Sequence, residues 1–125
     1  MKANHLFLAA AASFAFTGAL GQNETERAYA KAEPQKEAML LCFDVASIKF
    51  AVQTCEPAET LVEAAYGTCR SQEEAYAEAI VKNTGASRDA VIEGLAEGKR
   101  RLRQTLLGTV LKARIESGHC QGNSN

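Results

Sequence analysis

The sequence predicts an all-α protein: a small three-helix up-down-up bundle stapled by disulfides and preceded by a signal peptide. Three observations support this fold class. Strong helix formers (Ala, Glu, Leu and Lys) are abundant in a chain of 125 residues that has no Trp and two Pro. Turn signals divide the chain into three segments of helix length. Four cysteines are spaced so that folding these segments brings them together in pairs.

Residues 1–21 have the three parts of a cleavable signal peptide. Lys2 supplies a positive charge, residues 6–16 form an uncharged apolar run, and small residues follow. Ala19 and Gly21 suit a peptidase that cuts after Gly21, and cleavage after Ala19 is the alternative. A membrane anchor is a further alternative, but the apolar run is shorter than the roughly 20 residues that span a bilayer. We therefore expect an exported protein, either periplasmic or secreted.

After the signal, the chain is long enough for one helical domain, which we place at 34–120. Residues 22–33 are expected to be flexible or weakly helical, and the polar tail at 121–125 is expected to be disordered. Loss of Lys2 with the signal changes the formal net charge from −1 to −2. This near-balance gives no reason to expect nucleic acid or anionic lipid as a partner.

The first helix is predicted from Pro34, a residue tolerated at the first helical position, to about Cys55. Its apolar residues form two stripes on roughly opposite faces. One stripe contains Leu41, Val45, Ile48 and Val52, and the other contains Met39, Phe43, Ala46 and Phe50. A helix that is apolar on two faces has to be covered on both.

Proline and glycine mark the other two helices. Pro57 disfavours helical geometry in the residue before it, so a second helix is expected from Pro57 to about Asn83. Gly85 is placed for a left-handed cap after that helix. Ser87 is a natural N-cap for the third helix, which we expect to end at Gly118. The second helix has one seam of small and apolar residues: Ala58, Val62, Ala65, Cys69, Gln72, Tyr76 and Ala79.

The four cysteines are expected to form a disulfide framework, because an exported chain meets an oxidising environment. Cys42 and Cys55 lie about 20 Å apart along one helix, and a disulfide allows a Cα separation of only about 7 Å. A disulfide between Cys55 and Cys69 is excluded similarly, because Cys69 lies roughly three turns into the second helix. In an antiparallel hairpin of the first two helices, Cys42 comes level with Cys69, and folding the third helix back brings Cys120 to Cys55. We therefore predict the pairs Cys42–Cys69 and Cys55–Cys120.

No catalytic, cofactor or metal site is predicted. The chain has no Cys-x-x-Cys motif, and metal ligands in zinc sites usually come at spacings of two to four. After the signal, His119 is the one histidine, and it lies beside Cys120 at a helix end. A thiol nucleophile with a histidine base would need both groups in a defined pocket. Cross-linking is therefore the preferred role of the cysteines.

Two charged clusters have ordinary structural interpretations. The carboxylates of Glu73, Glu74 and Glu78 are spaced for ion pairs along a helix surface, which we prefer to paired acid–base chemistry. The basic run at 99–103 spreads around a helix, and Glu97 is placed to pair with Arg101. We interpret this run as a solvated face, with an anionic partner as the alternative.

One segment carries a recurring pattern. A helix bearing Cys42 and Cys55 is followed by the acidic turn Pro57-Ala58-Glu59-Thr60 and then by Ala64-Ala65-Tyr66-Gly67-Thr68-Cys69-Arg70. This arrangement resembles a Cys-helix-turn-Cys-helix pattern in short, uncharacterised exported bacterial helical proteins. The resemblance implies export and a helical hairpin, and it implies no activity.

The functional hypothesis is a non-enzymatic exported helical protein that acts by macromolecular binding in the cell envelope. The candidate interface is the stripe of Met39, Phe43 and Phe50, which a three-helix domain leaves partly uncovered. Its partner would be a protein or a second copy, and no stable membrane insertion of the mature chain is expected. The alternative is a small periplasmic stress or chaperone-like protein. An enzyme or ligand carrier would require a cavity of a few hundred Å³.

Overall fold

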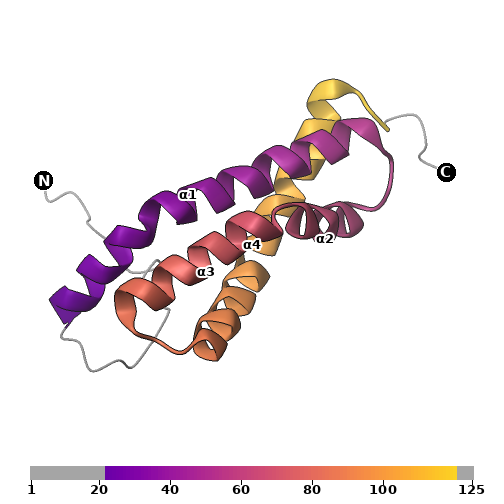
Figure 1. Cartoon of the computed structure of the whole chain (residues 1–125). Coiled ribbons are helices and arrows are strands. Elements are labelled where there is room, and N and C mark those ends of the chain that lie inside the picture. Colours follow the sequence, from indigo (N-terminus) through magenta and orange to yellow (C-terminus); the bar gives the residue numbers. More distant parts are fainter. Residues whose placement is uncertain (1–21, 121–125) are drawn as a thin grey trace, which may run out of the picture.

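A computed structural model describes residues 22–120 of the chain, and the predicted signal peptide (1–21) and tail (121–125) lie outside these residues. The described chain has four helices and no strand: α1 (Gln22–Gln53), α2 (Ala58–Thr68), α3 (Arg70–Thr84) and α4 (Arg88–Ser117). The all-α class is as predicted. The four helices form three arms that run up, down and up (Figure 1). The first arm is α1, the middle arm is α2 followed by α3, and the last arm is α4. The helix count is therefore four, where three were predicted.

Helix α1 begins at Gln22, twelve residues before the predicted start, so residues 22–33 are helical. Pro34 lies inside this helix and removes one backbone donor. Packing explains why the helix continues through it. Ala28 and Ala32 are buried, and with Met39 and Phe43 they continue one face of α1 along the bundle. Tertiary contact over that face outweighs the local cost of the proline.

The middle arm breaks at Cys69, where the backbone (φ −97°, ψ 19°) leaves helical geometry for one residue. The hydrogen-bond ladder nearly continues through the break, since the Cys69 N–H donates to the Ala65 carbonyl at 3.0 Å. Gly67 and the β-branched Thr68 are weak helix formers just before it. Cys69 is also fully buried and covalently tied to α1. A weak local helix and a fixed side chain therefore divide the predicted second helix into α2 and α3.

The predicted caps are confirmed. Gly85 (φ 71°) and Gly118 (φ 68°) adopt the left-handed conformation at the ends of α3 and α4, where a side chain would be strained. The Ser87 hydroxyl accepts a hydrogen bond from the Ala90 N–H at 3.2 Å and so caps the start of α4. These residues place the turn between the middle and last arms where the sequence predicts it.

Two disulfides join the cysteines in the pairing predicted from the hairpin geometry. Cys42 is bonded to Cys69 with a Cα separation of 5.9 Å, and Cys55 is bonded to Cys120 with a Cα separation of 5.6 Å. The first disulfide ties the middle of α1 to the break in the middle arm. The second ties the end of α1 to the end of α4. There Arg114 also donates hydrogen bonds to the carbonyls of Thr54 (3.1 Å) and Glu56.

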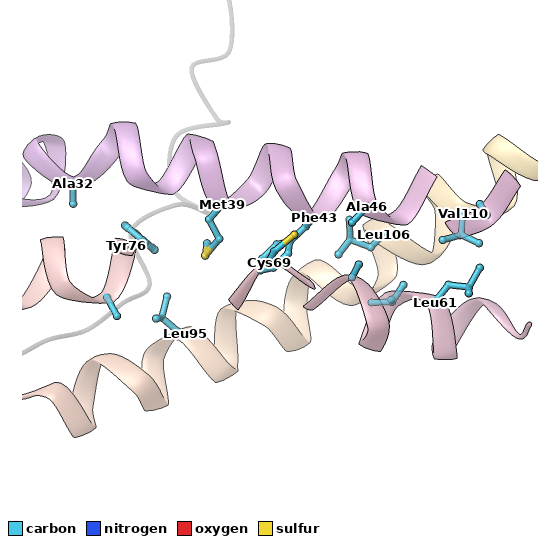
Figure 2. Close-up of a cluster of buried hydrophobic side chains, with 14 of the residues drawn as sticks. Ala32, Met39, Phe43, Ala46, Leu61, Cys69, Tyr76, Leu95, Leu106 and Val110 are labelled. Carbon is cyan, nitrogen blue, oxygen red and sulfur yellow. The ribbon is translucent and has the colours of Figure 1, made fainter. Parts of the chain in front are cut away.

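The core runs along the length of the three arms (Figure 2). Phe43 lies near its centre, fully buried, and packs edge-to-face on the ring of Tyr66 with a centroid separation of 4.9 Å. The Tyr66 hydroxyl donates to the Lys99 carbonyl at 2.8 Å, which links α2 to α4 across this centre. The largest fully buried side chains come from α1, α2, α4 and the junction of α2 with α3: Phe43, Ser47, Val62, Cys69, Val91, Leu106 and Val110.

Candidate binding surface

The two apolar stripes of α1 have different environments, and the one predicted as an interface is in the core. Met39 is 6% exposed and Phe43 is 0% exposed, and Phe50 is partly buried against the same core. Figure 2 shows Met39 and Phe43 pointing from α1 toward the other arms. The expectation that a three-helix domain leaves this stripe open is therefore corrected. The arms close over it, with Tyr66 and Leu106 among the residues of its cluster.

The opposite stripe is the exposed one. The exposed fractions of its side chains are 64% for Leu41, 56% for Val45, 44% for Ile48 and 39% for Val52. Spacings of four, three and four residues place these side chains on one helix face. They extend over about 16 Å of α1 at 1.5 Å per residue. An exposed row of this kind is typical of a protein–protein interface.

The residues of α1 that lie upstream of the two stripes distinguish one stripe from the other. The buried stripe continues upstream through Ala32 and Ala28, so its apolar face runs along most of α1. The outward stripe has no such extension, because the same face upstream carries Pro34 and Arg27. The longer apolar face is the one that a bundle of long arms can cover.

One acidic and one basic residue flank the outward stripe. Asp44 and Lys49 are both exposed, and they lie on opposite sides of the stripe at about 70° from its centre by the helical period of 3.6 residues. Among residues 22–120, neither side chain makes an ion pair within 4.0 Å. The stripe therefore has charged edges of both signs that are free to meet a partner.

The basic run at 99–103 differs, because its cations are neutralised within the chain. Lys99 pairs with Glu73 of α3 at 2.8 Å, and Arg103 pairs with Glu63 of α2 at 2.5 Å. Glu97 pairs with both other arginines of the run, with Arg101 at 3.3 Å as predicted and also with Arg100. The pairs of Lys99 and Arg103 join α4 to the middle arm, and the pairs of Glu97 lie within α4. Three carboxylates thus offset three of the four positive charges of the run, which leaves little charge to attract an anionic partner.

A groove of about 360 Å³ lies between α1, α3 and α4. Its walls are apolar, with Met39, Phe43, Tyr76, Leu95 and Leu102 among the lining residues. Its rim cations are already paired: Lys36 with Glu33 at 3.5 Å, Lys99 with Glu73, and Arg101 with Glu97. The groove has the size that a ligand carrier requires, but its rim offers no unpaired charge with which to orient a ligand.

The Cys55–Cys120 disulfide is accompanied by His119. The His119 Nε2 atom lies 3.7 Å from the Cys55 Sγ atom, and the three side chains could together face one metal ion. In the structure the two sulfurs are bonded to each other, so they are not thiolates, which are the form that binds metal. The arrangement serves to fasten the ends of α1 and α4.

The fold and its surface define a class: a disulfide-linked helical protein with an exposed apolar row along α1. No protein family, curated protein or solved structure matches this chain. No helix within residues 22–120 is both long and apolar enough to cross a membrane.

Proposed function

We propose that this chain is an exported, non-enzymatic protein that binds another macromolecule through the outward face of α1. The observation that carries the proposal is the exposure of Leu41, Val45, Ile48 and Val52 in one row. Burial of apolar surface contributes about 25 cal/mol per Å², so covering this row with a partner would be favourable. Each of these side chains would otherwise remain in water.

The charges of the chain favour a protein as the partner. A polyanion or an anionic lipid surface needs unpaired cations, and the cations of the run at 99–103 are paired with Glu63, Glu73 and Glu97. The outward stripe is flanked by one Asp and one Lys, so its apolar centre is bordered by one negative and one positive charge. An apolar centre with a polar rim is the usual composition of a protein–protein interface.

Export is supported by three observations. The sequence at 1–21 has the pattern of a signal peptide, the Cys-helix-turn-Cys-helix arrangement resembles that of exported bacterial proteins, and two disulfides suit an oxidising compartment. Peptide mapping of protein from the cell envelope tests this part. We expect a mature N-terminus at Gln22. A retained Lys2 in the envelope protein would contradict cleavage.

Binding through α1 is tested by site-specific photo-crosslinking in the organism that makes the protein. A photoreactive side chain at Ile48 should give adducts of discrete mass, because Ile48 lies in the outward stripe. The matched control places the same side chain at Glu78, an exposed position on α3. Equal labelling at both positions, or no adduct at Ile48, would remove the proposal.

The stress or chaperone-like alternative would use the same apolar stripe for many clients. It predicts a broad range of adduct masses from Ile48 and suppression of client aggregation by the purified protein. Discrete adducts without such suppression favour a defined partner.

A further inference from the structure

We infer that the macromolecule bound by this face is a second copy of the chain, packed parallel along α1. The inference rests on the proposed function, because it names the partner of the same surface. Three features carry it: the register of the apolar residues, the placement of the two flanking charges, and the position of the other helices.

The outward residues follow a heptad register. Ala38, Val45 and Val52 recur every seven residues, and Leu41 and Ile48 fall between them at the complementary positions. This spacing of three and four residues is that of the a and d positions in a two-stranded coiled coil. The β-branched Val45 and Val52 occupy a positions, and with Leu41 at a d position they make the combination that favours two parallel strands, while Ile48 at the other d position adds no such preference. The same face thus has the pattern that a second α1 requires.

The flanking charges select the parallel orientation. Asp44 takes the g position before Val45, and Lys49 takes the e position of the next heptad, five residues later. In a parallel pair, a g residue faces the e residue of the following heptad in the partner, so Asp44 of each copy meets Lys49 of the other. In an antiparallel pair, g positions face g positions and e positions face e positions, so Asp44 of one copy cannot meet Lys49 of the other. Opposite charges therefore pair twice in one orientation and not at all in the other.

The rest of the molecule leaves room for this packing. The residues of α1 that contact α2, α3 and α4 include Met39, Phe43 and Ala46, which lie on the face opposite the outward stripe. Figure 1 shows α1 along the upper edge of the molecule over most of its length, with α2 and α3 below it, while the C-terminal end of α4 crosses α1 near its end. A two-fold axis parallel to α1 can thus bring two copies together with the same surface on each, as in most homodimers.

The dimer should be weak and concentration-dependent. The row from Leu41 to Val52 spans about three helical turns, and specific stable interfaces bury about 800 Å² on each partner. A row of this length buries less area than that standard. We therefore expect a dissociation constant of about 1 μM or higher for the dimer. Sedimentation equilibrium over a wide concentration range measures an equilibrium of this strength.

Charge reversal at the flanks tests the orientation. Lys49→Glu turns both inter-copy attractions into repulsions, and we expect about a tenfold increase in the dimer dissociation constant. Adding Asp44→Lys to it restores both attractions with the signs exchanged, so the double variant should return to within about threefold of the parent constant. Lys82→Glu, a matched reversal at an exposed site on α3, should leave the constant unchanged. Equal constants for all four proteins would overturn the parallel arrangement.

Photo-crosslinking from Val52 tests the orientation and the identity of the partner together. A photoreactive side chain there should join two copies, and after reduction and trypsin digestion it should link the peptide 50–70 to the same peptide of the other copy. Linkage to the peptide 37–49, which holds Leu41, would show an antiparallel pair and overturn the inference. Adducts with a different protein alone would also overturn it while leaving the proposed function standing. The absence of any adduct would overturn both.

Discussion

The two faces of α1 carry similar apolar side chains and lie in opposite environments. The inward face places Met39 and Phe43 in the core, where α2, α3 and α4 surround them. The outward face places Leu41 and Val45 in water on the far side of the same helix turns. Apolar character alone therefore does not decide which face a bundle covers.

What distinguishes the faces is how well each matches long neighbouring arms. The inward face continues upstream through Ala28 and Ala32, both buried, and these small side chains let other helices approach closely. The outward face is short and has charged flanks at Asp44 and Lys49. A short apolar row with charged edges is better matched to one partner helix than to a bundle interior.

The largest test of this contrast is a pair of truncations on neighbouring turns. Phe43→Ala removes a fully buried ring that packs on Tyr66, and we expect it to lower the free energy of unfolding by about 3–5 kcal/mol. Leu41→Ala is the matched outward control and should change it by about 0.5 kcal/mol or less at a concentration where the protein is monomeric. Urea titration followed by circular dichroism measures both. Similar losses for the two variants would mean that both faces are buried in solution.

The Cys42–Cys69 disulfide allows a second test, because it fastens the inward face and does not touch the outward row. Replacing both cysteines with Ala reopens a loop closed across 27 residues. The expected loss is about 3–4 kcal/mol on the chain-entropy model. The dimer dissociation constant of the folded variant should remain that of the parent, since the row from Leu41 to Val52 is intact. If the variant loses dimerisation as well as stability, the outward surface depends on the bundle beneath it.

Much of the fold follows from local signals in the sequence. Gly85, Ser87 and Gly118 mark helix ends through backbone conformation and capping, which depend on a few neighbouring residues. The cysteine pairing follows from helix rise and the positions of two turns, so it too needs little tertiary information. The start of α1 and the break at Cys69 were mispredicted because tertiary packing decided both.

The candidate surface was predictable only in part. The sequence shows that α1 has two apolar stripes, but the choice of the covered one depends on contacts with residues distant in the chain, such as Tyr66 and Leu106. Met39, Phe43 and Phe50 were therefore assigned to a partly uncovered interface. The continuation of the buried stripe through Ala28 would have favoured the correct choice.

The smallest expected effect concerns Ser47, a polar residue on the inward face. Its side chain is fully buried, and its hydroxyl oxygen has no hydrogen-bond partner. An unpaired buried hydroxyl destabilises the folded state, so Ser47→Ala should raise the free energy of unfolding by about 1 kcal/mol. Helix propensity accounts for up to about 0.5 kcal/mol of that gain. Ser71→Ala, at an exposed position of α3 where the hydroxyl donates a hydrogen bond to the Gln72 side chain at 2.9 Å, measures this part together with the loss of that surface hydrogen bond. If Ser47→Ala is no more stabilising than Ser71→Ala, the inward face tolerates a polar group as readily as the outward face does, and the contrast between the two faces lies in packing alone.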